Sequence, residues 1–228
     1  MIPHRYYTPP PPAPPPPPDR SLQTFNLITR IALVLLAVGF LWFVKAFLWP
    51  ESRVRHAPGI LVANEPEQSD VKPPKVWDVN GYHITALATY SIEAEVLSKA
   101  RYYMGRECDL SPVDFALGWG RMSDQSLLDN LQISQSGRWY NYHWDGAPPA
   151  DPQEIVQHSA NTHLLPATPA ISAQLLAIKP GSIVKMKGYL ISATASDGWT
   201  WVSSLSRYDT GNRSCEVMWV ESVSARDQ

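Results

Sequence analysis

The stretch "GYHITALATYSIEAEVL", residues 81–97, decides which fold the sequence predicts. Apolar or small side chains recur there at every second position, namely Tyr82, Ile84, Ala86, Ala88, Tyr90 and Ile92. A period of two is that of a β-strand with one face turned toward a core. The stretch therefore predicts a long strand and places the chain among strand-rich folds.

Other segments rich in β-branched and aromatic residues predict further strands. They are residues 133–144, 183–195, 199–206 and 215–223. The tripeptide "SDG" separates the second of these segments from the third and is typical of a hairpin turn. Strands are thus expected to dominate the second half of the chain.

Helix start signals interrupt these strands. Ser111 followed by Pro112 matches an N-cap and a first helical position, and Asp151 begins the same pattern again. Another helix is expected to start at Ser123, and residues 171–182 predict a helical turn closed by Pro-Gly. We therefore predict an α+β fold, a strand-rich domain or small barrel with inserted helices.

The N-terminal part of the chain has a different composition. Residues 1–24 form a proline-rich tail, which extends as polyproline II and serves as a spacer or a docking strip. Residues 25–50 contain an apolar stretch from Ile31 to Trp49 in which Lys45 is the charged residue. Its length is close to the ~20 residues that cross a bilayer core. We predict an uncleaved, single-pass transmembrane helix that makes the lipid bilayer one partner of the protein.

Residues 51–75 are proline-rich with few apolar groups and predict a linker, and residues 76–228 predict one folded domain. A short tail before the span and a large domain after it favour an inner-membrane location with the C-terminal domain exported. The formal net charge of −2 gives no general attraction to nucleic acid. A protein partner in the cell envelope is expected instead.

The stretch "HSANTHLLPA", residues 158–167, concentrates candidate functional residues. His158, Asn161 and His163 lie there in a chain with six histidines. The sequence predicts a structured turn that lines a cleft, with a catalytic loop as the alternative. Arg207 and Asp209 predict either a binding rim or a loop that holds itself together by pairing the two. Arg138 is a further candidate binding residue.

The two cysteines, Cys108 and Cys215, leave two possibilities open. In an oxidising compartment an even pair more often forms a disulfide, and two separate buried thiols are the alternative. Metal binding is not favoured, because the chain has neither an H-E-x-x-H motif nor paired C-x-x-C motifs. No cofactor is predicted either.

The segments "SPVDFALGWGRMSD", "SQSGRWY", "HSANTHLLPA" and "WTWVSSLSRYDTGNRSCEV" together resemble a family of bacterial proteins with a single membrane anchor. No activity is attached to that family, so the resemblance implies a location and not a reaction. The sequence predicts a non-enzymatic domain that binds a partner or ligand.

The order of His158 or His163, then Cys215, is similar to that of sortase-like transpeptidases, which are anchored β-barrels. Their T-L-x-T-C signature is replaced here by "NRSCEV", and the arginine that follows, Arg226, lies in a polar tail. A cysteine transpeptidase or other hydrolase is therefore the alternative function. Such an enzyme is expected to place a histidine within hydrogen-bond reach of Cys215.

Overall fold

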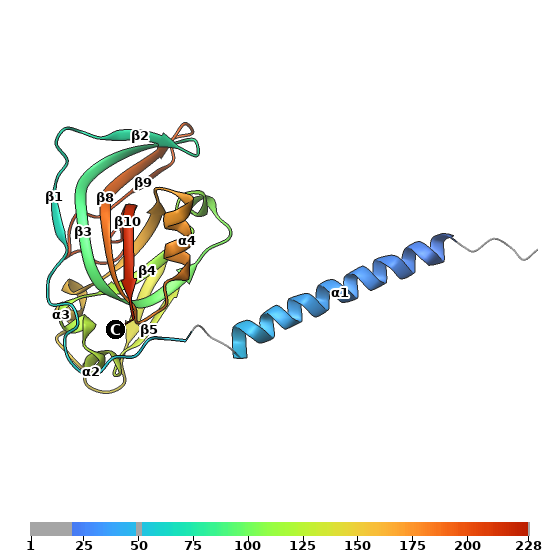
Figure 1. Ribbon diagram of the computed structural model, residues 1–228, viewed down its shortest axis with the longest axis horizontal. Coiled ribbons are helices and arrows are strands. Elements are labelled where there is room, and N and C mark those ends of the chain that lie inside the picture. Colours follow the sequence, from blue (N-terminus) through green and yellow to red (C-terminus); the bar gives the residue numbers. More distant parts are fainter. Residues whose placement is uncertain (1–19, 49–51, 228) are drawn as a thin grey trace, which may run out of the picture. The chain divides into compact units, whose positions relative to one another are not determined.

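The computed structural model describes residues 20–48 and 52–227. The chain divides into two compact units, Met1–Pro50 and Glu51–Gln228. In the first unit, helix α1 covers Arg20–Leu48 (Figure 1). Among the described residues, no helix combines the length and the apolar character needed to cross a membrane. Most of the predicted proline-rich tail, residues 1–19, lies outside the described part of the chain.

The second unit is α+β and strand-rich. Its strands are β1 (Glu67–Asp70), β2 (Val76–Val79), β3 (Tyr82–Arg101), β4 (Val113–Gly118), β5 (Gln132–Ser136), β6 (Trp139–His143), β7 (Ser159–Pro166), β8 (Ile183–Ala195), β9 (Thr200–Val202) and β10 (Glu216–Arg226). Its helices are α2 (Gln125–Leu128), α3 (Pro152–Gln157) and α4 (Pro169–Ala177), with short 3₁₀ turns η1 (Arg106–Asp109) and η2 (Gly120–Ser123).

Five strands close into a barrel in the order β3, β4, β7, β10, β8 and back to β3. Strand β3 closes it because its first part pairs with β8 and its last part with β4, and the two pairings meet at Glu95. Strands β7 and β10 are parallel, whereas the other pairs in the ring are antiparallel. Five strands closed in this order have the topology of an OB barrel. Figure 1 shows β3 curving around the barrel.

The barrel interior is an apolar core. Alternate residues of each strand point inward, as the period of two requires. The core combines these side chains with Leu175 of α4, and its fully buried members include Ile92, Val113, Phe115, Leu164, Val184, Met186 and Met218. The predicted strands at residues 81–97, 183–195 and 215–223 are confirmed as β3, β8 and β10, apart from a residue or more at their ends.

Two sequence-based predictions are wrong at the element level. Residues 111–117 were expected to form a helix but contribute to β4, and the expected turn at residues 158–167 is mainly β7. Both strands are covered on both faces, with burial running through β4 without a break. A strand buried on both sides does not alternate in polarity, and its cap-like Ser and Asp residues then imitate a helix start.

Other expected elements are present. Helix α3 begins after Asp151, whose side chain accepts a hydrogen bond from the backbone N–H of Gln153 at 2.9 Å. The single strand expected at residues 133–144 is a hairpin of β5 and β6. Its two turn residues, Gly137 and Arg138, have φ values of 56° and 69°. Positive φ at both positions is the signature of a type I′ turn, which matches the twist of the strands it joins.

Residues 52–75, predicted as a linker, contact the barrel along much of their length. The guanidinium of Arg53 lies 2.7 Å from the buried carboxylate of Glu95, and strand β1 pairs with β3. Gly181 has φ +85° and packs against the carbonyl of Val54, where a Cβ atom would collide. These contacts make the segment part of the same compact unit as the barrel.

Candidate binding cleft

The outward face of β4 and β7 carries the polar residues of the candidate site. Asp114 pairs with His163 across the two strands, and Ala116 pairs with Asn161. Residues two apart on a strand share a face, so Asn161 and His163 point to the same side of the barrel wall. Cys215 precedes β10, the parallel neighbour of β7. The strands thus bring three sequence-predicted residues, Asn161, His163 and Cys215, into one region.

Asp114 is the centre of this region and is completely buried. The Nη1 atom of Arg138 donates to Asp114 Oδ1 at 2.8 Å, and Ser111 Oγ lies 3.3 Å from the same oxygen. Nδ1 of His163 lies 2.9 Å from Asp114 Oδ2, an ion-pair distance without hydrogen-bond alignment. Arg138 also donates from Nη2 to the carbonyl of Ser111 at 2.8 Å. A buried carboxylate is therefore held by a guanidinium and approached by an imidazole.

Arg138 reaches Asp114 because of the hairpin turn that carries it. Its left-handed backbone, with φ 69°, turns the side chain back onto β4. The guanidinium carbon lies 4.0 Å from the ring centre of Tyr102 and 5.4 Å from that of Trp201. The His163 ring lies 4.8 Å from that of Trp201. Burial raises the pKa of Tyr102 to about 12. The polar cluster is thus enclosed by aromatic rings.

The sulfur of Cys215 accepts a hydrogen bond from Asn161, with 3.6 Å between Nδ2 and Sγ. The same Nδ2 also donates to the carbonyl of Arg138 at 3.1 Å. Gln135 fixes the amide further by donating to Asn161 Oδ1 at 2.7 Å. Burial, with some help from nearby carboxylates, raises the pKa of Cys215 to about 11. The side chain is therefore a neutral thiol at physiological pH. Within the described residues, no hydrogen bond joins it to a histidine.

His158 belongs to a different setting. It is the C-cap of α3, and its Nδ1 lies 2.9 Å from the carbonyl oxygen of Glu154. Its ring fills the space beside Gly120, where a Cβ atom would lie 2.6 Å from the ring. His158 thus secures a helix end.

Two adjacent pockets open around Cys215, and they share Trp139 and Cys215. We call the first the His163 pocket; it has a volume of about 310 Å³ and is lined by Arg138, Trp139, His163, Thr200, Trp201, Val202, Asn212, Arg213 and Cys215. The second, the Glu216 pocket, has a volume of about 180 Å³. Its lining comprises Trp119, Trp139, Tyr140, Tyr142, Val156, Ser159, Ala160, Asn161, Ser206, Arg207, Asp209, Thr210, Gly211, Ser214, Cys215 and Glu216. Together the two pockets form the candidate binding cleft.

Glu216 lies at the inner wall of the second pocket and is 4% exposed. It pairs with Thr162 on the parallel neighbour and faces the barrel interior, on the opposite side of β10 from Val217. Burial raises its pKa to about 8, and the Asp209 carboxylate adds to the effect while Arg207 opposes it. Its Oε2 atom has no hydrogen-bond partner among the described residues. Burial therefore favours the protonated form of the Glu216 carboxyl group.

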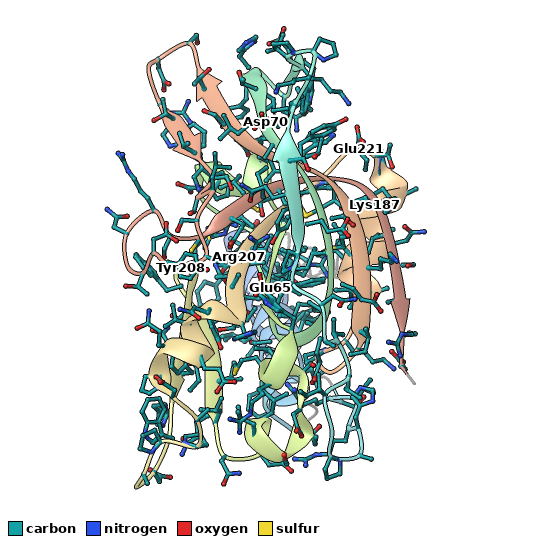
Figure 2. All side chains as sticks on the ribbon, turned by 90° about the vertical axis from the view of Figure 1, so that its left-hand side faces the viewer. Glu65, Asp70, Lys187, Arg207, Tyr208 and Glu221 are labelled. Atoms are coloured by element: carbon teal, nitrogen blue, oxygen red, sulfur yellow. The ribbon has the colours of Figure 1, made fainter. Side chains whose placement is uncertain are left out.

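Arg207 and Asp209 both line the Glu216 pocket, but they do not form the internal pair that the sequence suggested. Nη2 of Arg207 donates to the carbonyl of Pro66 at 2.6 Å, which ties the loop to the segment before β1. Asp209 Oδ2 accepts from Ser204 Oγ at 2.7 Å. In Figure 2, Arg207 lies between the labelled residues Glu65 and Tyr208, which with Arg207 line a neighbouring pocket.

The predicted disulfide is not formed, because Cys108 and Cys215 are both free. The Cys108 thiol donates a hydrogen bond to the carbonyl of Tyr102 at 3.2 Å, and the Cys215 sulfur accepts one from Asn161. The alternative of two separate thiols therefore describes the structure. Within the described part of the chain, no group of three or more His, Cys, Asp or Glu side chains is placed to hold a metal ion.

Sequence reasoning missed Asp114 as a site residue, along with Trp139, Trp201 and Glu216. A polar residue inside an apolar run was the available signal for Asp114, which lies three residues after the predicted helix start at Ser111. Glu216 directly follows the singled-out Cys215 and begins an otherwise apolar strand. Comparison of the chain with protein-family models, curated proteins and solved structures finds no match.

Proposed function

We propose that the protein is a membrane-anchored binding module of the bacterial cell envelope that holds a ligand in the cleft around Trp139. One observation carries this proposal: Trp139 is 46% exposed and lines both pockets. A concave site lined by aromatic side chains with a few fixed polar groups is the usual form of a ligand site. A large aromatic residue that stays exposed beside two pockets is more typical of a residue that contacts a ligand than of one that packs in the core.

The polar groups of the cleft are held in place before any ligand arrives. Arg138 is fixed by Asp114 and Ser111, and Asn161 is fixed by Gln135 and Arg138. Preorganised groups lose little conformational entropy on binding, which favours affinity. By analogy at the level of fold, OB barrels bind ligands on the face of their second and third strands and the neighbouring loops. Strands β4 and β7 occupy these positions here.

The state of Cys215 supports binding rather than cysteine catalysis. A nucleophilic cysteine reacts as a thiolate and needs a cationic neighbour that lowers its pKa. Here burial raises the pKa to about 11, and the groups that act on the thiol include the carboxylates of Asp114, Asp209 and Glu216. His163 approaches Asp114, and its ring lies tilted against that of Trp201. The cysteine hydrolase or transpeptidase is therefore the less favoured function.

The anchor is part of the proposal. The apolar side chains of α1 from Phe25 to Leu41 are 53–70% exposed, and the apolar stretch of the sequence continues to Trp49. A helix that is apolar on every side is typical of a membrane span or a buried core. Fusion of alkaline phosphatase after Gln228 is expected to give an active enzyme in the periplasm. An active cytoplasmic reporter at the same position would place the domain on the other side of the membrane.

The cleft itself is tested with the full chain in phosphocholine detergent micelles. We expect at least one class of envelope component, tested as soluble glycan fragments, lipid headgroups or peptides, to raise the melting temperature. Trp139→Ala is expected to abolish that rise, whereas Tyr208→Ala, which removes a more exposed aromatic ring outside both pockets, is expected to retain it. Binding that survives Trp139→Ala, or an absence of binding by every class, would overturn the proposed function.

A further inference from the structure

We propose that the ligand is an extended acidic peptide segment of a partner protein, which adds to the free edge of strand β9 and places its carboxylates in the His163 pocket. This inference rests on the proposed function and names its ligand class. Two independent features carry it: the open backbone edge of β9 and the cations of the pocket beside that edge.

Strand β9 is the last strand of its sheet and pairs with β8 on one side (Figure 1). Two backbone hydrogen bonds to the β8 strand show which residues face it: the carbonyl of Trp199 accepts at 2.9 Å, and the N–H of Ser203 donates at 3.0 Å. Backbone groups in an antiparallel pair face the partner strand at every second residue. The backbone of Trp201 therefore faces β8, and the N–H and C=O groups of Thr200 and Val202 point to the open side. Among the described residues, no backbone hydrogen bond from outside the β8–β9 pair reaches them.

Strand β9 also lacks the chemical protection that is common at a sheet edge. Edge strands often carry charged residues or proline, which discourage the addition of a further strand. Strand β1, at the opposite end of the sheet, begins with Glu67 and ends with Asp70. Strand β9 has the sequence Thr-Trp-Val, with neither a charge nor a proline. Because it is short, it can pair with only a few residues of a ligand, and side-chain contacts must supply the remaining affinity.

The His163 pocket lies along this open edge, because Thr200, Trp201 and Val202 all line it. The Trp201 side chain points toward the barrel wall, where its ring lies 4.8 Å from that of His163. Neighbouring residues of a strand point to opposite faces, so the half-exposed side chain of Val202 points away from the wall. An added strand alternates in the same way. One set of its side chains enters the pocket, and the other set lies beside Val202.

The pocket offers cations without an anion in its own lining. Arg138, Arg213 and His163 line it, whereas the carboxylates of the cleft line the Glu216 pocket. Arg138 is paired with the buried Asp114, but Arg213 has no ion-pair partner among the described residues. An exposed cation of this kind favours a ligand carboxylate and disfavours a ligand cation.

The edge and the charges together define the sequence pattern of the peptide. Acidic side chains are expected on the face that enters the pocket, where they meet Arg213. Apolar, β-branched side chains are expected on the face beside Val202, because they suit an extended backbone and pack well across neighbouring strands. The ligand is therefore a segment in which acidic and β-branched residues alternate.

The test measures peptide binding to the full chain in phosphocholine detergent by fluorescence anisotropy. The probe is a fluorescein-labelled octapeptide in which valine alternates with aspartate, and the matched peptide has lysine in place of aspartate. We expect the aspartate peptide to bind about 10-fold more tightly, because lysine side chains would meet the arginines of the pocket. Equal affinities, or no binding by the aspartate peptide, would overturn the inference.

Methylation of alternate backbone amides separates strand addition from binding through side chains alone. An added strand directs every second N–H group toward β9, so only one of its two sets of amides is needed. Two further peptides carry N-methyl groups either on the valines or on the aspartates. We expect one of them to lose about 10-fold in affinity and the other to retain it. Equal effects of the two methylations would refute strand addition.

Substitutions in the protein test the same contacts from the other side. Val202→Pro removes the outward N–H but no bond to β8, and peptide affinity is expected to fall about 10-fold. Val202→Ala keeps that N–H and is expected to change affinity less than about 2-fold. Arg213→Gln is expected to weaken the aspartate peptide about 3-fold, and Arg213→Lys to restore most of that loss. Melting temperatures check that each variant is folded, and the methylated peptides test the edge on the wild-type protein.

The outcomes separate this inference from the proposed function. If no peptide binds while a glycan fragment or a lipid headgroup binds in a Trp139-dependent manner, the peptide inference fails and the binding module stands. If only one methylation weakens the aspartate peptide but Trp139→Ala does not, addition at β9 stands and the proposed cleft around Trp139 fails. Self-association that Val202→Pro abolishes, without any peptide binding, would assign the edge to a second copy of the chain.

Discussion

Strands β8 and β10 differ from strands β4 and β7 in how the barrel uses them. On β8, buried and exposed residues alternate between Val184 and Lys187, and Lys185 and Lys187 face solvent. Strand β4 is buried throughout, and its outward face carries Asp114 beneath the hairpin of β5 and β6. Strands β8 and β10 build the barrel wall, and the sequence pattern of each allowed it to be predicted as a strand. In the second pair, and at the start of β10, burial on both faces removes the alternation, and β7 and the start of β10 supply residues of the cleft.

The largest loss of stability that this comparison predicts follows from removing the buried charge of β4. Asp114→Ala leaves the guanidinium of Arg138 enclosed without its carboxylate and removes the partner of Ser111 Oγ. We expect the free energy of unfolding to fall by about 3–5 kcal/mol, as for other broken buried ion pairs. Urea denaturation monitored by circular dichroism measures it.

Lys187→Ala on β8 is the matched control, since it also removes one charge from a barrel strand but from an exposed position (Figure 2). Its expected cost is within about 0.5 kcal/mol. Equal costs for the two variants would mean that the outward polar residues of β4 and β7 are ordinary surface residues, and the contrast between the two strand pairs would be wrong.

The difference between the strand pairs also explains how far the sequence could be interpreted. Strands with one apolar face, such as β3 and β8, were predicted within a few residues because alternation reports their burial directly. Helix α3 was predicted from its cap, which is a local signal. Closure of the barrel depends on the pairing of β3 with β8, which lies more than 80 positions further along the chain, and no local pattern encodes it.

The site was only partly predictable for the same reason. Asn161, His163, Arg138 and Cys215 were singled out as polar or reactive residues, and the strand pairing brings them together. Asp114, which contacts Arg138 and His163, could not be assigned because a buried carboxylate at a strand start has the same sequence signature as a helix start. The free state of the two cysteines depends on tertiary position, which their number does not reveal.

The second largest expected effect concerns the buried carboxyl group of Glu216, at the start of β10. Its pKa rises from 4.5 to about 8 on burial, so the folded chain binds this proton more tightly than the unfolded chain. Its contribution to stability is therefore lost as the pH rises from about 4.5 through about 8. Glu216→Gln abolishes the titration, and we expect the variant to gain roughly 4 kcal/mol relative to wild type between pH 5 and pH 9.

Thermal or urea unfolding of both proteins at the two pH values measures that gain as a difference of differences. Titrating groups that both proteins share, such as Glu95 with a pKa of about 7, cancel in the comparison. A stability difference that does not change with pH would show that Glu216 is ionised in the folded state, and the protonated carboxyl group assigned to the Glu216 pocket would be wrong.

The smallest expected effect concerns Cys215, which lies between the polar face of β7 and the start of β10. Since both cysteines are free, reducing agent is expected to leave the melting temperature unchanged, and Cys215→Ala is expected to cost only about 1 kcal/mol through the lost contact with Asn161. Cys108→Ala should cost a similar amount, and the two costs should add, because a shared disulfide would instead make them overlap. Ligand binding at the cleft should persist in Cys215→Ala, since a neutral buried thiol supplies shape to both pockets and no reactive group. A variant that stays folded and still binds its ligand, but loses a chemical turnover seen in wild type, would instead assign Cys215 to catalysis and reverse the order of the two functions.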